Sequence, residues 1–264
     1  MYPFIELAGN KFGLFPLCVG IGLGSGAILV FWQLKRLSVS SERENAVMLA
    51  IPLTFIAGVA GAYLLDAFLH GGWLAIFRKP TGWGVTFYGW LLAAIGFISI
   101  YAKISKVPAS FILNLFCPGF IIAHAWGRVG CFLGGCCYGC PSKWGVVYPP
   151  GSFPYSRCGA TPLLPVQLFE CVYLLIVFVI VFFFIRFKHR AAWYIILSPA
   201  GRFVLEFFRG DDRGQLLGKT LSPSQWISIG LFAAGILWLM KLKHKENGIR
   251  IRCASGCGRG SPAV

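Results

Sequence analysis

Charged residues are scarce in this chain of 264 amino acids. They make up 12% of the sequence, whereas hydrophobic residues make up 57% and aromatic residues 16%. A soluble globular domain carries about twice that charged fraction, so the composition excludes an ordinary water-soluble fold. It predicts an all-α polytopic membrane protein, and the length suits a single membrane-embedded domain.

Acidic residues are the rarer of the two charge types. Nine Asp and Glu stand against 24 Lys and Arg, which gives a formal net charge of +15. In a soluble protein this excess would suggest nucleic acid as a partner. Here the basic residues flank apolar runs, as the positive-inside rule and anionic lipid head groups require. We therefore expect the membrane, and no nucleic acid, as the partner of these charges.

The sequence has neither a cleavable signal peptide nor an internal repeat. The first apolar segment has neither a basic start nor an A-x-A-like cleavage site, so we expect it to stay in the membrane as a span. The sequence shows no internal repeat, whereas many transporters are built from inverted repeats.

Seven apolar stretches are long enough to cross a membrane. They run over approximately 13–32, 46–69, 84–101, 109–127, 163–187, 191–209 and 223–241. The basic residues of the connectors gather on one side of these spans, which predicts an amino terminus outside the cell and a cytoplasmic carboxyl terminus. We expect one transmembrane domain over residues 1–245 and a disordered basic cytoplasmic tail over 246–264. The segment 141–162 is rich in Pro, Gly and Ser and is expected at the outer surface without regular structure.

One segment places polar groups directly after an apolar run. It reads Gly127-Arg-Val-Gly-Cys-Phe-Leu-Gly-Gly-Cys-Cys-Tyr-Gly139. A charged group such as Arg128 costs roughly 2.5 to 3.5 kcal/mol at membrane depth, so it usually faces a cavity or a partner. Glycines such as Gly127 and Gly130 let the backbone approach a ligand or another helix. We expect the chemistry of the protein here.

A second group of charges lies in the sixth apolar stretch. Arg202, Glu206 and Arg209 follow one another at spacings of four and three, which puts them on one face of a helix. They could form a mutual ion pair that makes their burial tolerable. They could also form an anion site in which Glu206 holds Arg202 for a phosphate, because guanidinium groups offer paired donors in a fixed plane. Three charges in one apolar helix favour the anion site.

His124 lies four residues before Arg128, so the two share a face if the span stays helical. A histidine whose ring is satisfied by a backbone carbonyl is the simpler interpretation. Beside a phosphate site, however, histidine is the natural proton acceptor near neutral pH.

Three further polar positions have structural as well as functional interpretations. Glu170, in Pro165-Val-Gln-Leu-Phe-Glu170, is either a helix-start carboxylate favoured by the helix dipole or a member of the site. Tyr88 is either an interfacial aromatic or a member of the site. The segment His70-Gly-Gly72 ends an apolar run, where His and Gly commonly terminate helices.

The chain has ten cysteines, and five of them fall in or next to the predicted outer loop, namely Cys131, Cys136, Cys137, Cys140 and Cys158. The spacing Cys137-x-x-Cys140 is typical of metal ligands, an outer loop also permits disulfides, and small apolar packing is the third interpretation. No histidine or carboxylate accompanies these cysteines in the loop, so we expect no metal.

In order along the chain, several segments resemble the signature of the prolipoprotein diacylglyceryl transferases. The matching pieces are Gly127-Arg-Val-Gly130, Gly135, Tyr138-Gly139, Trp144-Gly-Val-Val-Tyr-Pro149, Pro165-Val-Gln-Leu-Phe-Glu170, Arg202-Phe-Val-Leu-Glu-Phe-Phe-Arg209 and Ser224-Gln-Trp-Ile-Ser228. The resemblance extends over roughly residues 50 to 240 and fits the seven-span frame.

The resemblance implies an enzyme of the bacterial plasma membrane. Such an enzyme moves the diacylglyceryl group of phosphatidylglycerol onto the thiol of a lipobox cysteine in a secreted precursor, and glycerol phosphate is the second product. The family's signature arginine corresponds to Arg128, and its late arginine and glutamate to Arg202 and Glu206. The implied site needs no metal and no cofactor. The residues that we expect to bind substrate are Arg128, Gly127, Gly130, Arg202, Arg209, Tyr138, Gln167 and Glu170.

The sequence departs from the family pattern at three positions. The family's histidine falls at Tyr88, its asparagine at Cys131 and a glutamate at Cys136. A phenol with a pKa of about 10 is a poor base at pH 7, so our hypothesis is that His124 takes over the proton-accepting role, with Tyr88 beside it. A related lipid transferase with another acceptor, and a cysteine-based redox or transport protein, remain as alternatives.

Overall fold

The structure is a computed structural model that describes residues 4–7, 10–71, 86–210 and 221–256. Within these residues the protein is nearly all helical, and seven helices are long and apolar enough to cross a membrane. The prediction of an all-α polytopic membrane protein with about seven spans is therefore confirmed. The side of the membrane on which each terminus lies stays a prediction.

Seven long helices build the described part of the bundle, and two of them continue into short turns of other helix types. They are α1 (Leu14–Leu37), α2 (Ser41–Gly71), α4 (Phe87–Ser105), α5 (Ala109–Gly134), α7 (Val166–Val179) with η1 (Ile180–Phe184), α8 (Arg190–Leu205) between η2 (Phe187–His189) and η3 (Glu206–Phe208), and α9 (Pro223–Gly256). The smaller elements are the strands β1 (Phe4–Leu7), β2 (Asn10–Gly13) and β3 (Pro141–Val146) and the helix α6 (Phe153–Cys158).

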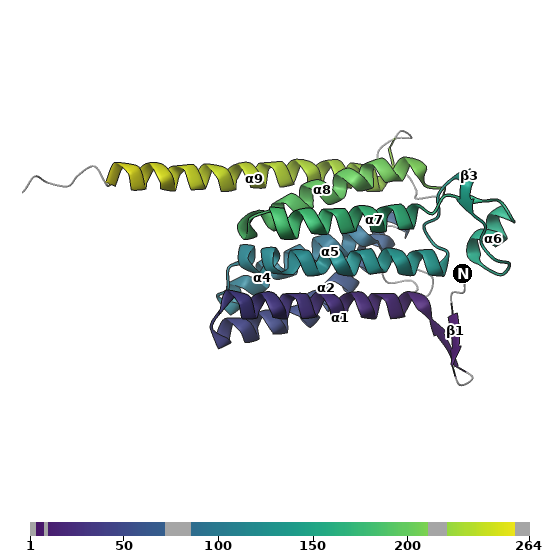
Figure 1. Ribbon diagram of the computed structural model, residues 1–264, viewed down its shortest axis with the longest axis horizontal. Helices are drawn as coiled ribbons and strands as arrows, with labels where there is room; N and C mark the ends of the chain where they lie inside the picture. The colour runs from purple at the N-terminus through teal and green to yellow at the C-terminus, as the bar shows by residue number, and fades with distance from the viewer. Residues whose placement is uncertain (1–3, 8–9, 72–85, 211–220, 257–264) are drawn as a thin grey trace, which may run out of the picture.

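The long helices lie side by side, with α1 and α2 on one flank of the bundle and α9 on the other (Figure 1). The β1–β2 hairpin, β3 and α6 all lie at one end of this bundle. We call this end the loop end. Because α5 and α8 finish there while α7 and α9 begin there, the loop end gathers helix termini and the polar residues that they carry.

Glycines allow α1 and α5 to touch along their backbones. A Cβ atom on Gly26 would lie 2.7 Å from the carbonyl oxygen of Gly119, and a Cβ on Gly119 would lie 2.7 Å from the oxygen of Gly26. A Cβ on Gly22, one turn earlier, would lie 3.0 Å from the backbone of Ala123. Small residues four apart are the usual means by which membrane helices approach this closely. The contact fixes α1 against the helix that carries His124 and Arg128.

The segment 141–162 contains regular structure, so the prediction that it has none is wrong. Strand β3 forms bridges to Leu163, and Ser152 caps the start of α6, because its hydroxyl accepts a hydrogen bond from the backbone N–H of Tyr155. Tyr148 and Leu163 are almost fully buried beneath these elements. The segment is rich in Pro and Gly, but a capping serine and a small apolar core give it regular structure.

Helix α9 continues to Gly256, past the predicted end of the domain at residue 245. The division of the chain at that point stays a prediction, and residues 257–264 lie outside the described residues. Of the segment His70-Gly-Gly72, the structure places residues 70 and 71 at the end of α2, and Gly72 lies outside the described residues.

The glycine contact predicts the effect of adding one methyl group. Gly26→Ala should lower the free energy of unfolding by about 1–3 kcal/mol, because the added Cβ overlaps the backbone of α5. Gly24→Ala is the matched control, since a Cβ there meets no heavy atom within 4 Å, and alanine favours the helix. Thermal unfolding in detergent, followed by tryptophan fluorescence, measures both variants. Equal midpoints for the two would contradict this role of the contact.

Candidate active site

Four ionised side chains from three parts of the chain meet inside the bundle near the loop end. The Arg128 Nη2 atom of α5 lies 3.0 Å from Oε1 of Glu170 in α7. The Arg202 Nη1 atom of α8 lies 2.9 Å from Oε2 of the same glutamate, and its Nη2 lies 3.1 Å from Oε2 of Glu206. All four side chains are less than a tenth exposed. Glu170 therefore joins the two arginines, one on each carboxylate oxygen.

One guanidinium donor of this cluster is left for a ligand. The Nε atom of Arg128 is buried and has no hydrogen-bond partner among the described residues. A buried donor without a partner costs about 1–3 kcal/mol, and more for a charged group. Arg209 adds a third guanidinium, since its Nε lies 3.9 Å from Oε2 of Glu206 and its side chain is buried. Arginine stays protonated in proteins, so an anion that accepts from Arg128 would satisfy this donor.

His124 lies beside this cluster between aromatic rings. Its imidazole stacks on Phe87, with ring centroids 4.1 Å apart, and lies 6.0 Å from the ring of Phe120. Its Nε2 lies 3.3 Å from Nη2 of Arg128 and 3.8 Å from Oε1 of Glu170. A guanidinium can only donate, so a hydrogen bond from Arg128 needs a neutral imidazole whose proton is on Nδ1. The Nδ1 atom is buried and has no hydrogen-bond partner among the described residues.

Helix α9 and the residue before it supply hydroxyl groups to the same region. The Ser228 hydroxyl donates to the carbonyl of Ser224 at 2.7 Å, so the hydroxyl of Tyr88, 2.5 Å away, donates to Ser228. The Ser222 hydroxyl donates to Oε1 of Glu206 at 3.0 Å. Tyr88 keeps its proton and donates it in a hydrogen bond to Ser228, so it suits the role of a positioning residue better than that of a base.

Gly127 and Gly130 differ in their surroundings. No heavy atom of the described residues lies within 4 Å of the place that a Cβ on Gly127 would take, whereas a Cβ on Gly130 would lie 3.0 Å from the ring of Phe15. Gly127 therefore leaves space beside Arg128 that a ligand can use. Gly130 instead serves the packing of α1 on α5.

Gln167 and Tyr138 support the loop that follows α5. The Nε2 atom of Gln167 donates to the carbonyl of Cys136 at 2.7 Å and to the Tyr148 hydroxyl at 3.1 Å. Tyr138 is buried against Tyr148 and Leu163. The structure brings both residues close to the site, where they hold protein groups. Direct contact of either residue with a substrate stays a prediction.

The loop after α5 turns sharply and carries three cysteines. Gly135 ends the helix in the left-handed region, at φ 74°, and its N–H bonds back to the last turn. Cys137 also has a positive φ of 63°, which is strained for a residue with a side chain. The Sγ atoms of Cys131, Cys136 and Cys137 all lie within 4.8 Å of one another. We call these three residues the thiol cluster.

Backbone hydrogen bonds fix this loop to both neighbouring segments. The N–H of Cys140 donates to the carbonyl of Phe208, and the N–H of Gly210 donates to the carbonyl of Tyr138. The N–H of Gly139 donates to the carbonyl of Leu164, just before α7. The loop that carries the thiol cluster is therefore held against the end of η3, two to four residues after Glu206.

Charge and hydrogen bonds distinguish one of the three thiols. Hydrogen bonds from Cys131 and Cys136 and the nearby guanidinium groups of Arg209 and Arg128 hold the pKa of Cys137 well below its usual range, although burial opposes this. No disulfide joins the eight cysteines whose side chains the structure describes.

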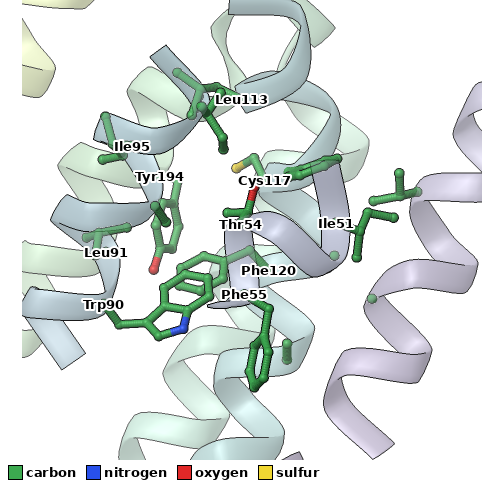
Figure 2. Close-up of a pocket in the computed structure, with 18 of the residues that line it drawn as sticks. Ile51, Thr54, Phe55, Trp90, Leu91, Ile95, Leu113, Cys117, Phe120 and Tyr194 are labelled. Carbon is green, nitrogen blue, oxygen red and sulfur yellow. The ribbon is translucent and has the colours of Figure 1, made fainter. Parts of the chain in front are cut away.

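An apolar cavity of about 130 Å³ opens one turn away from His124. Leu91 and Ile95 of α4, Cys117 and Phe120 of α5 and Tyr194 of α8 point into it, as Figure 2 shows. Phe120 stacks on Trp90 at 4.9 Å and on the ring of His124. One aromatic ring thus separates an apolar cavity from the ionised cluster, which suits a ligand with a charged head and an apolar chain.

The bundle and the buried cluster define the class of this molecule as a polytopic membrane protein with an ionised site inside its helices. The sequence model described as prolipoprotein diacylglyceryl transferase matches residues 4–241. This chain belongs to the prolipoprotein diacylglyceryl transferase family. Membership makes it a transferase and decides against the transport or redox interpretation.

Similar proteins support the same assignment over nearly the whole chain. The phosphatidylglycerol–prolipoprotein diacylglyceryl transferase 2 of Clostridium perfringens (strain 13 / Type A) is 30% identical over 261 residues, which cover 92% of this chain and 97% of that protein. The corresponding transferase of Clostridium tetani (strain Massachusetts / E88) is 28% identical over 88% of this chain and 93% of its own length.

The structure brings most of the expected site residues together, and it makes Glu170 more central than the sequence suggested. The sequence linked Arg202 to Glu206 and His124 to Arg128, and both contacts are present. No sequence signal indicated that Glu170 joins the two pairs, because that contact crosses between helices. Ser228 was also missed as a site residue, although it lies in a matched motif.

The position of Glu170 between Arg128 and Arg202 predicts a large effect when its charge is removed. Glu170→Gln removes a charge that two buried arginines share, so it should destabilise the protein by about 3–5 kcal/mol. The control is Glu44→Gln, which breaks a pair at 2.8 Å with the exposed Lys35 at the surface of the bundle and should cost less than about 1 kcal/mol. Thermal unfolding in detergent compares the two variants. Similar small losses for both would show that Glu170 does not hold the cluster together.

Proposed function

We propose that this chain moves the diacylglyceryl group of phosphatidylglycerol onto the cysteine thiol of a lipoprotein precursor, in the plasma membrane of a bacterium. The observation that carries the proposal is the buried pair of Arg128 and Arg202 close to an apolar cavity, with one donor of Arg128 that has no partner in the described part of the chain. A phosphodiester lipid has an anionic acceptor group and an apolar chain, so it matches both features. The family assignment and the names of the relatives support the same donor and acceptor.

The phosphate of the donor lipid accepts a hydrogen bond from Nε of Arg128, and Arg202 lies on the other side of the Glu170 carboxylate. Glu170 and Glu206 hold these guanidinium groups in place, and the space beside Gly127 gives the head group access. As the bond from glycerol carbon to phosphate oxygen breaks, a second negative charge grows on the phosphate. Arginines already oriented in a water-poor site stabilise that charge without reorganising, and such electrostatic stabilisation usually contributes more to catalysis than any other single effect.

The acyl region of the lipid extends toward the cavity lined by Leu91, Cys117 and Phe120. The wall of this cavity is almost entirely apolar, so a hydrocarbon segment enters it without losing hydrogen bonds. The loop end then faces outward, where a secreted precursor arrives, in agreement with the predicted outer amino terminus.

The acceptor thiol needs to lose its proton before it attacks. A free cysteine has a pKa of about 8.5, and His124 is the neutral base nearest to the arginines. Phosphate binding would draw the Arg128 guanidinium away from Nε2 of His124, which frees that atom to take the proton. Tyr88 and Ser228 keep the neighbouring wall of the site in place.

The direct test is complementation of a bacterial strain that lacks its own lipoprotein transferase. The wild-type chain should restore a thioether-linked lipid on a reporter precursor. Arg128→Lys should reduce transfer by about 10²–10³-fold, because a single ammonium cannot replace paired donors to an oxyanion. Arg157→Lys, which changes an arginine stacked on Phe153 outside the cluster, is the control and should keep full transfer.

A well-expressed wild-type chain that leaves the precursor unlipidated would contradict the proposed acceptor. Mass spectrometry of the reporter detects this outcome, since a precursor without lipid has the mass of the unmodified peptide.

The proposed base gives a separate prediction. His124→Gln should lower kcat by about 10²–10⁴-fold while the variant still binds phosphatidylglycerol, because only proton transfer is removed. His189→Gln is the matched control, since that histidine pairs with Glu246 and is far along α8 from the cluster. Transfer assays in phosphatidylglycerol vesicles measure both. Full activity of the His124→Gln enzyme would exclude this residue as the base.

A further inference from the structure

The thiol cluster already has the spacing of a metal site. Three sulfur ligands around one zinc ion, each about 2.3 Å from it in tetrahedral directions, lie roughly 3.8 Å apart. The Sγ atoms of Cys131, Cys136 and Cys137 all lie within 4.8 Å of one another. A shift of less than about 1 Å per sulfur, which side-chain rotation supplies, brings them to that geometry.

A disulfide explains this arrangement less well. Cys136 and Cys137 are consecutive, so their Cα atoms are about 3.8 Å apart, which is shorter than the usual range for a disulfide. A bridge from Cys131 to either of them would leave the third thiol unused. Apolar packing does not explain the cluster either, since Cys136 is exposed.

The loop is built to keep the thiols together. Cys137 occupies a left-handed conformation that costs about 1–3 kcal/mol, and such strain concentrates at functional sites. Backbone hydrogen bonds from Gly139, Cys140 and Gly210 hold the loop on two sides. Gln167 adds a hydrogen bond to the carbonyl of Cys136. Ligands held in this way lose little entropy on binding a metal.

Three ligands leave one tetrahedral position open. Among the described residues the group contains only Cys131, Cys136 and Cys137. Structural zinc sites are closed by four protein ligands, whereas catalytic sites have three and an open fourth position. The exposed side of Cys136 gives that position access from the loop end.

The open position of the zinc ion also lies next to the proposed phosphate site of the donor lipid. Cys131 follows Arg128 by about one helical turn, and the loop is bonded to the backbone directly after Glu206. An entering nucleophile at this position would therefore be close to the phosphate that Arg128 and Arg202 bind. In this reaction the nucleophile is a thiol, which is itself a preferred zinc ligand.

We infer that Cys131, Cys136 and Cys137 bind a zinc ion, and that the acceptor cysteine of the precursor binds this ion as its fourth ligand before it is alkylated. The inference rests on the proposed function and adds the way in which the acceptor is held. By resemblance, Cys131 and Cys136 stand where the family has asparagine and glutamate. In this chain the zinc ion would hold the acceptor cysteine in place of the asparagine and glutamate of the family.

The step balances without any redox partner. On binding zinc, the acceptor S–H loses its proton, which passes to His124, and the sulfur becomes a thiolate. The sulfur electron pair forms the new bond to the glycerol carbon, while the carbon–oxygen bond to phosphate breaks. Glycerol phosphate leaves with that electron pair, and the thioether, a weaker ligand than a thiolate, leaves the zinc. Zinc does not change its oxidation state.

Metal content is the first test. The full chain, purified in detergent with reductant and without chelator, should contain one zinc ion, measured by elemental mass spectrometry. Cys131→Ser, Cys136→Ser and Cys137→Ser should each lose the zinc and lower transfer by at least about 10- to 100-fold, the loss seen when even residues around metal ligands are replaced. Cys158→Ser, a thiol beside the loop but outside the cluster, should keep both.

Acceptor binding is the second test. Protein loaded with Co²⁺ in place of zinc should show thiolate-to-metal absorption, which should increase when a lipobox peptide is added. The same peptide with serine in place of its cysteine should leave the spectrum unchanged. An unchanged spectrum with the cysteine peptide would overturn the open position as the acceptor site.

Failure of the inference can be told apart from failure of the proposed function. Transfer by a metal-free wild-type chain, or by the Cys137→Ser variant at full rate, would overturn the zinc site and leave the transferase intact. A mass two units below that of the reduced chain, with no zinc, would also overturn it in favour of a disulfide. Absence of transfer by the zinc-loaded wild-type chain would instead reject the proposed function, and with it the acceptor role of the zinc.

Discussion

The ion pairs of Glu170 determine how the rest of this molecule is arranged. Ionised groups inside an apolar bundle are tolerated only when each finds a partner, and one carboxylate here serves both Arg128 and Arg202. The contact joins α5, α7 and α8 near the loop end, and His124 of α5 lies beside the same carboxylate. The close backbone packing of α1 on α5 and the apolar cavity beside Phe120 are arranged around that junction.

The proposed donor and acceptor halves of the site are built by different means. Side chains of long helices form the proposed phosphate site, so its geometry is as rigid as the bundle. The thiol cluster lies on a loop, but the loop is bonded to the end of α8 and to the start of α7. The proposed acceptor half is therefore almost as well fixed as the donor half, although it contains two of the three positions at which, by resemblance, this chain departs from its family, Cys131 and Cys136. A change of acceptor chemistry can thus occur without disturbing lipid recognition.

The sequence predicted most of what depends on local pattern. Hydropathy located all seven spans that the described residues contain, and helical spacing paired Arg202 with Glu206 and His124 with Arg128. It did not predict the bridge by Glu170 or the hydrogen bond of Tyr88 to Ser228, because both depend on how distant helices are rotated toward one another. The strand and helix within residues 141–162 were missed because their stability comes from burying Tyr148 and Leu163, and not from local propensity.

The charged cluster should make lipid recognition insensitive to acidity. Its cations are guanidinium groups, which do not titrate at physiological pH, and a phosphodiester does not titrate there either. Binding of the donor should therefore stay constant over that range. Any bell-shaped dependence of turnover on pH must then originate on the acceptor side, in the imidazole and the thiols. The pH profile of this enzyme would report on how its nucleophile is activated.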